Sequence, residues 1–266
     1  MSELDVLLDY MLGDKAVSLE YRFQKGESLK YRISLNSDYT FAKDGAQPEH
    51  RKNETALTLI QTVKAINYND SFDLEIFFKE DKKITGNTES EFTKNEGSLR
   101  LRMLKNGRIT HSSVGPAFSF PPFPERPLMK GESWMEENQL TLPGHRQAVP
   151  FQYTLTDFKE INGHECAVLE VEAPELTIFL EAGLEQKVLV KGVNYFDHQN
   201  GRLIKSEVKS ASEILGYDWK AQNQTSLQVE LVTPEESRES LEETEIPEEF
   251  MVVDPIISEK LLKKAS

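Results

Sequence analysis

The chain has a single cysteine and no long apolar run. One cysteine, Cys166, excludes an intrachain disulfide, and its apolar neighbours predict a buried strand position rather than a reactive thiol. No apolar run reaches the roughly 18–20 residues that cross a bilayer, and the first residues lack the basic start and apolar core of a signal peptide. We therefore predict a cytoplasmic protein without a membrane span. The alternative is an exported or periplasmic protein whose signal peptide is absent from this sequence.

Basic residues are outnumbered by acidic ones. Lys and Arg total 31 against 45 Asp and Glu, which gives a formal net charge of −14 at pH 7. A chain of this charge repels nucleic acid and anionic membranes before short-range contacts can form. We predict another protein as the partner, neutral or basic in charge, with an apolar ligand as a second possibility and no nucleic acid.

The residue patterns of common catalytic and metal sites are also lacking. No phosphate-binding glycine loop, nucleophile elbow or dinucleotide fingerprint is present, and the histidines are not at zinc-ligand spacing. The His-Glu-Cys run at 164–166 has ligand-type residues, but adjacent strand residues face opposite sides of a sheet. Asp70, Asp73 and Glu75 alternate without the loop glycine of a calcium site. We predict no metal and no cofactor, and we assign no catalytic residue.

What the sequence does contain is an internal repeat. The tetrapeptide Lys-Gly-Glu-Ser occurs at 25–28 and again at 130–133, and an Asn-Gly-Arg tripeptide follows at 106–108 and again at 200–202. The order is the same in both copies, which differ in length by roughly ten residues, a change that loops tolerate at little free-energy cost. The repeat predicts a duplicated domain.

Apolar residues recur at every second position through both copies, as in strands with one buried face. Tight turns are expected at 67–70, 106–107, 162–163 and 200–201, where Asn, Asp and Gly cluster. Strands are expected within 17–35 and at 55–66, 72–78, 99–104, 109–114, 134–142, 151–158, 166–171, 189–196, 203–214 and 225–232.

The predicted fold is mainly β, with two tandemly duplicated, mostly antiparallel sheets. The two apolar faces can pack together as a sandwich, or both copies can join in one curved half-barrel with a concave surface. A short N-terminal helix and a C-terminal amphipathic helix complete the expectation. The predicted organisation is an N-terminal helix (1–16), β repeat 1 (17–115), a Pro/Phe-rich connector (116–128), β repeat 2 (129–233), an acidic linker (234–249) and a C-terminal docking segment (250–266).

The connector is too rich in proline to form a central strand. Its aromatic residues, Phe118, Phe120 and Phe123, predict a strap over one end of the core. The alternative is an exposed proline-rich ligand for an aromatic groove on another protein.

The end of the chain combines an acidic stretch with an apolar segment. Glutamate dominates 235–249, which predicts a solvated linker, and an amphipathic helix is expected after Pro255. Such a tethered segment implies a docking site, either on the sheet of the same chain or on a partner. The residues expected to bind are Phe250, Met251, Val252, Ile256, Ile257, Leu261 and Leu262.

The segment 123–134, with its Pro-Glu-Arg-Pro and Gly-Glu-Ser-Trp elements, resembles an uncharacterised bacterial family of duplicated β-sheet proteins, many of them exported or lipid-anchored. The stretches 162–167 and 195–203 are similar to later elements of that family. The resemblance covers 17–232 and implies a duplicated β fold, and no catalytic residue is carried over from it. A more distant similarity is to half-barrel lipoprotein carriers.

Three functions follow as hypotheses. The first is a noncatalytic protein-interaction or scaffold module with a tethered docking helix. The second is a carrier that binds an apolar or lipid-like ligand on a concave sheet, which predicts a lined cavity of about 300–1,000 Å³. The third is a hydrolase, which requires two carboxyl groups that converge in a cleft.

Overall fold

The computed structural model describes residues 16–85, 88–89, 96–112, 120–142, 145–179 and 184–232, and these residues contain strands and no helix. The expected C-terminal helix, the acidic linker and, apart from Ala16, the expected N-terminal helix lie outside the described residues. The strands are β1 (Ser28–Lys43), β2 (Glu49–Ile66), β3 (Ser71–Thr85), β4 (Thr88–Glu89), β5 (Glu96–Leu104), β6 (Ile109–Ser112), β7 (Ser133–Leu142), β8 (His145–Ile161), β9 (His164–Phe179), β10 (Glu185–Asp197), β11 (Arg202–Leu215) and β12 (Trp219–Leu231).

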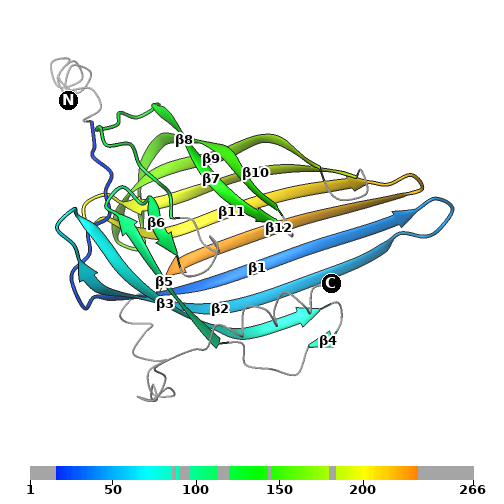
Figure 1. Cartoon of the computed structure of the whole chain (residues 1–266), viewed down its shortest axis with the longest axis horizontal. Helices are drawn as coiled ribbons and strands as arrows, with labels where there is room; N and C mark the ends of the chain where they lie inside the picture. Colours follow the sequence, from blue (N-terminus) through cyan, green and yellow to red (C-terminus); the bar gives the residue numbers. More distant parts are fainter. Residues whose placement is uncertain are drawn as a thin grey trace, which may run out of the picture. The chain divides into compact units, whose positions relative to one another are not determined.

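All twelve strands belong to one antiparallel sheet (Figure 1). Its order is β6-β5-β3-β2-β1-β12-β11-β10-β9-β8-β7, and β4 pairs with β3. The first and last strands of the chain are therefore neighbours at the centre, from Tyr31 opposite Leu231 to Lys43 opposite Trp219. The expectation of two separate sheets is wrong, and the single curved sheet is observed, because the pairing of β1 with β12 satisfies two strands that would otherwise be edges.

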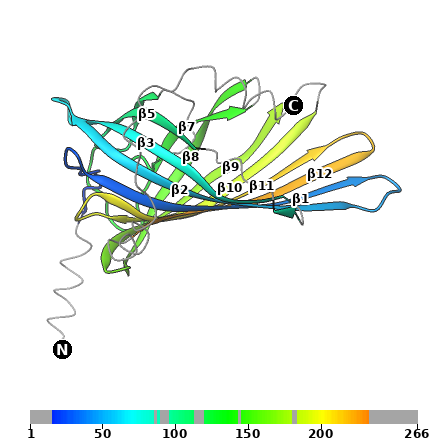
Figure 2. The same ribbon diagram turned by 90° about the horizontal axis from the view of Figure 1, so that it is seen from below.

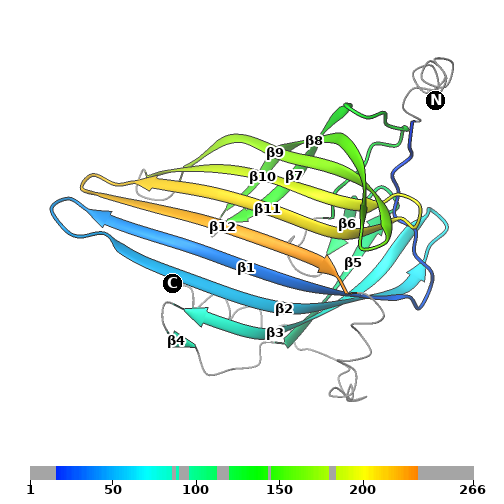
Figure 3. The same ribbon diagram turned by 180° about the vertical axis from the view of Figure 1, so that it is seen from behind.

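The sheet is curved, with β3 and β5 on one arm and β7 to β9 on the other rising on the same side of β1 and β12 (Figure 2). Register shifts within five strand pairs, such as β8–β9 and β2–β3, contribute bends of the kind that β-bulges introduce. One hydrophobic cluster takes side chains from both arms, so it lies on the concave side. Figure 3 views the convex side of the same strands.

Alternation along the strands sorts side chains between the two faces. Tyr31 and Ile33 of β1 are buried on the concave face, whereas Arg32 and Asn36 are exposed on the convex face. We call the end of the sheet where β1 begins the near end, and the end where β1 meets the turn toward β2 the far end. On β1, β2 and β3 the buried core lies at the near end, where the most deeply buried side chains are Ile33, Gln61, Val63, Leu74 and Ile76. On β9 and β10 the core reaches further toward the far end, to Leu176 and Val188.

Two segments outside the strands close the near end. The N-terminal strap, residues 16–24, donates from Tyr21 N to Lys105 O (2.7 Å) and from Arg22 N to Gly201 O (3.0 Å), and so bridges two turns of the sheet. Gly201 permits this approach, because it has φ +65° and a Cβ there would lie 2.5 Å from Arg22 N. The strap also pairs with the connector through Val17 and Leu128.

The connector fills the near end with aromatic side chains, as the strap hypothesis predicts. Phe120 and Phe123 are buried, and the ring of Phe123 contacts those of Tyr21 and Phe196. The third aromatic residue of the prediction, Phe118, lies outside the described residues. The confirmed pair shows that the proline-rich segment acts as a plug for the core at these two positions.

The connector also bridges the two edges of the sheet. Phe123 N donates to Asn106 O (2.7 Å) beside β6, and Trp134 Nε1 of β7 donates to Pro122 O (2.9 Å). An ion pair crosses directly, with Arg108 Nη2 2.6 Å from Glu136 Oε1 of β7. Side chains and the connector therefore link β6 to β7 at the near end, although the described residues show no backbone pairing between these strands.

The predicted tight turns are confirmed, and the repeated tetrapeptide forms the same structure twice. Positive φ angles occur at Asp70, Gly107, Asn162, Gly163 and Gly201 in the expected turns.

Each Lys-Gly-Glu-Ser element precedes a strand and makes an equivalent set of hydrogen bonds, while a common origin of the two copies stays a prediction. The bonds are Gly26 N to Val63 O (2.8 Å) and Gly131 N to Leu155 O (2.6 Å), Val63 N to Glu27 O (2.9 Å) and Leu155 N to Glu132 O (3.0 Å), and Ser28 Oγ with Thr62 Oγ1 and Ser133 Oγ with Thr154 Oγ1 (2.9 Å each).

Candidate functional site

The most buried charged group of the described residues is the carboxylate of Asp197, at the β10–β11 turn. It accepts hydrogen bonds from Asn200 Nδ2 (2.7 Å), Asn200 N (2.8 Å) and Gln199 N (3.0 Å), and its Oδ2 lies 2.7 Å from His164 Nδ1. Burial raises the pKa of Asp197, but the hydrogen bonds from Asn200 and His164 outweigh it, so the pKa lies below the ordinary value. Every contact is a turn or strand contact, which indicates a structural role.

Cys166 lies beside Asp197 and His164, but its thiol is not activated as a nucleophile. His164 and Cys166 are two residues apart on one strand and share a face, and Asp197 is the cross-strand partner of Cys166. From the sequence, we considered only that adjacent residues of the 164–166 run face opposite sides. Residues two apart on a strand share a face, and that spacing brings His164 and Cys166 together. The Cys166 thiol donates to the backbone oxygen of His164 (3.5 Å), and burial raises its pKa to about 12. The thiolate is therefore disfavoured at neutral pH, and the predicted buried thiol is confirmed.

The other candidate carboxylates are held by cations. Arg102 makes a bidentate pair with Asp73 (2.6 and 3.0 Å), and Lys64 lies 2.6 Å from Glu75. Asp70 lies 3.5 Å from Lys105. The part of the chain that the structure describes contains no group of three or more potential metal ligands, and its only buried carboxylate is Asp197. The converging carboxyl pair that a hydrolase requires is not found among these residues.

The predicted docking residues, from Phe250 to Leu262, lie outside the described residues, so docking stays a prediction. Within the described ranges, no helix is long and apolar enough to cross a membrane.

The concave face continues well beyond the packed core. β1 has 16 residues and β2 has 18, and β1 pairs with β12 along its far half. The far-end concave side chains of β1, β11 and β12, together with Asn53 of β2, are called the far floor. Its larger apolar members are Leu35, Tyr39, Phe41, Val208, Ile214, Trp219 and Leu227.

The apolar side chains of the far floor are only partly covered. Tyr39 is 37% exposed, and Leu35, Phe41 and Trp219 are half-buried. The core cluster extends as far as Leu227 but does not include the other six. The described segments outside the strands are turns and the near-end closures, so none of them crosses the far floor.

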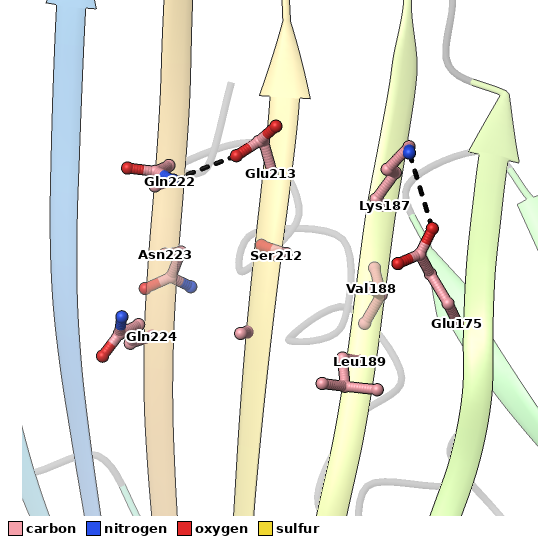
Figure 4. Close-up of a pocket in the computed structure, with 10 residues that line it drawn as sticks. Glu175, Lys187, Val188, Leu189, Ser212, Glu213, Gln222, Asn223 and Gln224 are labelled. Atoms are coloured by element: carbon pink, nitrogen blue, oxygen red, sulfur yellow. Dashed lines mark hydrogen bonds and ion pairs between the residues drawn. The ribbon is translucent and has the colours of Figure 1, made fainter.

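A shallow depression lies at the far ends of β9 to β12 (Figure 4). Its volume is about 330 Å³, and ion pairs and amides line most of it, including Lys187 with Glu175 (3.5 Å) and Glu213 with Gln222 (3.0 Å). These side chains lie on the convex face, by alternation with Val188. The depression is therefore not the apolar cavity expected of a carrier, and the far floor lies on the opposite face of the sheet.

Comparison with known proteins gives distant structural likenesses only. No family model and no curated protein matches the sequence. Lipovitellin has 11% identity and a TM-score of 0.47 over 80% of this chain, which spans only 26% of the lipovitellin chain. DynF from the dynemicin biosynthesis pathway of Micromonospora chersina has 8% identity and a TM-score of 0.24, covering 84% and 89% of the two chains. A LolA-superfamily protein from Nitrosomonas europaea has 9% identity and a TM-score of 0.17, covering 80% and 90%.

Since each TM-score is below 0.5, what these three proteins bind or make says nothing of this chain. The resemblance to a duplicated bacterial family likewise stays a prediction, because no family model tests it. The functional conclusion has to come from the far floor itself.

Proposed function

We propose that this chain is a carrier that holds an apolar ligand against the far floor. The observation that supports the proposal is the unequal covering of one concave face. The near end is filled by the strap and connector, while the same face continues at the far end as half-buried apolar side chains. Since exposing apolar surface costs about 25 cal/mol per Å², a partly exposed floor of this kind favours an occupant.

The arrangement also defines how a ligand would enter. At the near end, the Arg108–Glu136 ion pair and the connector link the two edges of the sheet, which blocks access from that side. At the far end, Phe41 and Trp219 stack with ring centroids 5.8 Å apart. An aromatic pair offers a flat apolar contact at the position where a ligand would first meet the floor.

The scaffold hypothesis has less support from the described residues. Its docking helix lies outside them, and the carrier hypothesis uses a surface that they do contain. The carrier, which was the alternative, is therefore the better supported function. A pull-down with residues 250–266 as bait tests whether that segment binds a protein.

The test is a matched pair of substitutions on neighbouring residues of β1. Leu35→Asp places a charge on the far floor, and Asn36→Asp places the same charge on the convex face. Titration with the fluorescent apolar probe N-phenyl-1-naphthylamine measures the affinity of each variant. We expect Leu35→Asp to weaken binding about tenfold or more, because burying a leucine contributes about 1.5–3 kcal/mol, and Asn36→Asp to leave it within about twofold.

Melting temperatures of both variants serve as the folding control. Equal affinities in folded Leu35→Asp and wild-type protein would contradict the proposal, as would the absence of any probe binding to the wild type.

A further inference from the structure

A band of uncharged polar side chains crosses the far floor between two apolar rows. We call it the polar belt, and its residues are Ser37, Asn53, Ser210, Ser212, Asn223 and Thr225. The cross-strand pairs Ser37–Asn53, Ser37–Thr225, Thr225–Ser210 and Asn223–Ser212 make it continuous over four strands.

The rows on either side of the polar belt are apolar. Leu35 and Leu227 face each other on the side toward the core, and Phe41 lies opposite Ala221 on the side toward the far end. A ligand that lies along the strands therefore meets apolar, polar and again apolar groups. A pure hydrocarbon would leave the belt unpaired and removed from water, which is unfavourable.

Two acceptor atoms of the polar belt take part in none of its hydrogen bonds. Ser37 Oγ lies 3.2 Å from Thr225 Oγ1, and Asn223 Nδ2 donates to the same Thr225 oxygen (3.2 Å). Asn53 Oδ1 and Asn223 Oδ1 are buried and receive no hydrogen bond. Buried polar atoms are usually paired, and rotation about χ2 turns an amide oxygen toward a ligand at small cost. The atoms that lack partners are acceptors, so the complementary ligand group is a donor.

The charge of the far floor restricts the ligand further. On the concave face of β1, β2, β11 and β12 from the Leu35 row to the Phe41 row, the charged residues are Arg51 and Glu49 at the rim. These two form an ion pair with each other (3.5 Å) and are 67% exposed. One strand further, Lys83 of β3 lies on the same face opposite Thr55, so the cationic side chains are on the β2–β3 side of the belt. A charged headgroup at Asn223, on the opposite side, would lose its hydration without gaining a counter-charge, whereas a neutral one would not.

We propose that the ligand is a neutral amphipathic lipid whose hydroxyl-bearing headgroup donates hydrogen bonds to the polar belt while its aliphatic chain lies on the apolar rows. This inference rests on the proposed carrier function and names the class of its ligand. The headgroup binds at Asn53 and Asn223, and the chain lies toward Leu35 and Leu227.

The test is displacement of bound N-phenyl-1-naphthylamine by four twelve-carbon compounds below their critical micelle concentrations. They are 1-dodecanoylglycerol, which is neutral with donors, methyl dodecanoate, which is neutral without donors, dodecanoate and dodecyltrimethylammonium. We expect 1-dodecanoylglycerol to bind about tenfold more tightly than methyl dodecanoate, as two added hydrogen bonds allow, and more tightly than either ion.

Asn223→Leu and Asn53→Leu remove the acceptors at nearly constant size, and Asn36→Leu is the matched control on the convex face. The belt variants should reduce the preference for 1-dodecanoylglycerol to within about twofold while methyl dodecanoate binds as before, and the control should keep the full preference. Melting temperatures establish that each variant is folded.

The outcomes separate this inference from the carrier function. Equal binding of 1-dodecanoylglycerol and methyl dodecanoate, or an unchanged preference in the folded belt variants, would overturn the role of the belt and leave the carrier function standing. Tighter binding of either ion would overturn the neutral headgroup. Failure of the wild type to bind the probe at all would overturn both proposals.

Discussion

At the scale of single residues, Asp197 shows how a buried charge can be structural. Its carboxylate is 1% exposed and receives bonds from the backbone and side chain of the turn that it precedes. His164 of β9 also contacts it. One carboxylate at the end of β10 therefore connects the start of β9 with the turn that leads into β11. Polar groups satisfied in this way stabilise a fold without needing a reaction to explain them.

Asp197→Asn should therefore lower stability, and change its dependence on pH. Because the folded-state pKa of Asp197 is lowered, its contribution is fully present above the unfolded value near 3.8 and is lost as pH falls through the folded pKa. We expect a loss of about 1–3 kcal/mol at pH 7 and a shallower fall of stability below pH ~4. Urea unfolding between pH 2 and 7 measures both.

The control is Asp38→Asn, at an exposed carboxylate 3.8 Å from Lys52. Its melting temperature should match the wild type at pH 7. An Asp197→Asn protein with the stability and pH profile of the wild type would show that the turn does not depend on this charge.

At the scale of elements, the closure between β6 and β7 decides which end of the concave face is open. Backbone pairing would need the two edge strands in register, but β6 has only four residues. Elsewhere in the sheet, backbone hydrogen bonds hold neighbouring strands together. Between β6 and β7 the Arg108–Glu136 ion pair and the connector do so instead. Glu136 is mostly buried, at 13% exposure, which makes this pair less screened by solvent than the surface pairs.

A double-mutant cycle with Arg108→Ala and Glu136→Gln should give a coupling energy of about 1 kcal/mol, because the contact is bidentate and partly buried. The comparison is Lys43→Ala with Asp218→Asn, a pair at the far end whose side chains are 59% and 46% exposed. That cycle should give a coupling near zero. Urea unfolding of the wild type and the six variants gives both values, and equal couplings would contradict a closing role for Arg108 and Glu136.

At the scale of the whole molecule, the two sequence copies share one core. Tyr21 of the strap packs against Phe123 of the connector and Phe196 of the second copy, with centroid separations of 5.4 and 5.0 Å. The described residues up to Leu231 belong to one compact unit. The copies should therefore unfold together rather than as independent domains.

Phe123→Ala tests this directly, because Phe123 is fully buried where the strap, connector and second copy meet. We expect a loss of about 3–5 kcal/mol, with tryptophan fluorescence and far-UV circular dichroism following one transition in both proteins. Phe77→Ala, at a ring 37% exposed, should have a much smaller effect. Separate transitions for the two probes would contradict a shared core.

The near-end halves of the strands could be predicted from the sequence, but most of the far halves could not. The strands β7 and β11 are exceptions, because they were predicted over nearly their whole length. Alternation is clear from Leu29 to Leu35, and the prediction of β1 ended there, whereas the strand continues to Lys43. Likewise β2 begins at Glu49 rather than Thr55, and β12 at Trp219 rather than Thr225. These stretches carry polar residues on both faces, so the apolar period of two is lost. They are strands because hydrogen bonds from both neighbours hold them extended.

The candidate site was missed for the same reason. The polar belt combines residues from β1, β2, β11 and β12, and nothing local in the sequence relates Ser37 to Thr225. Asn53 and Asn223 also look like ordinary surface residues when read along their own strands. Only the register of the sheet places them on one face.

By itself, the sequence determined the strand character of the apolar segments, the tight turns at Asn-Gly pairs and the burial of Phe120, Phe123 and Cys166, because each depends on interactions between near neighbours or on the transfer of an apolar group out of water. Only the tertiary structure decided that β1 pairs with β12, that one end of the concave face is filled and that the other forms the far floor. Those features depend on contacts between residues up to about two hundred positions apart, for which no local pattern carries information.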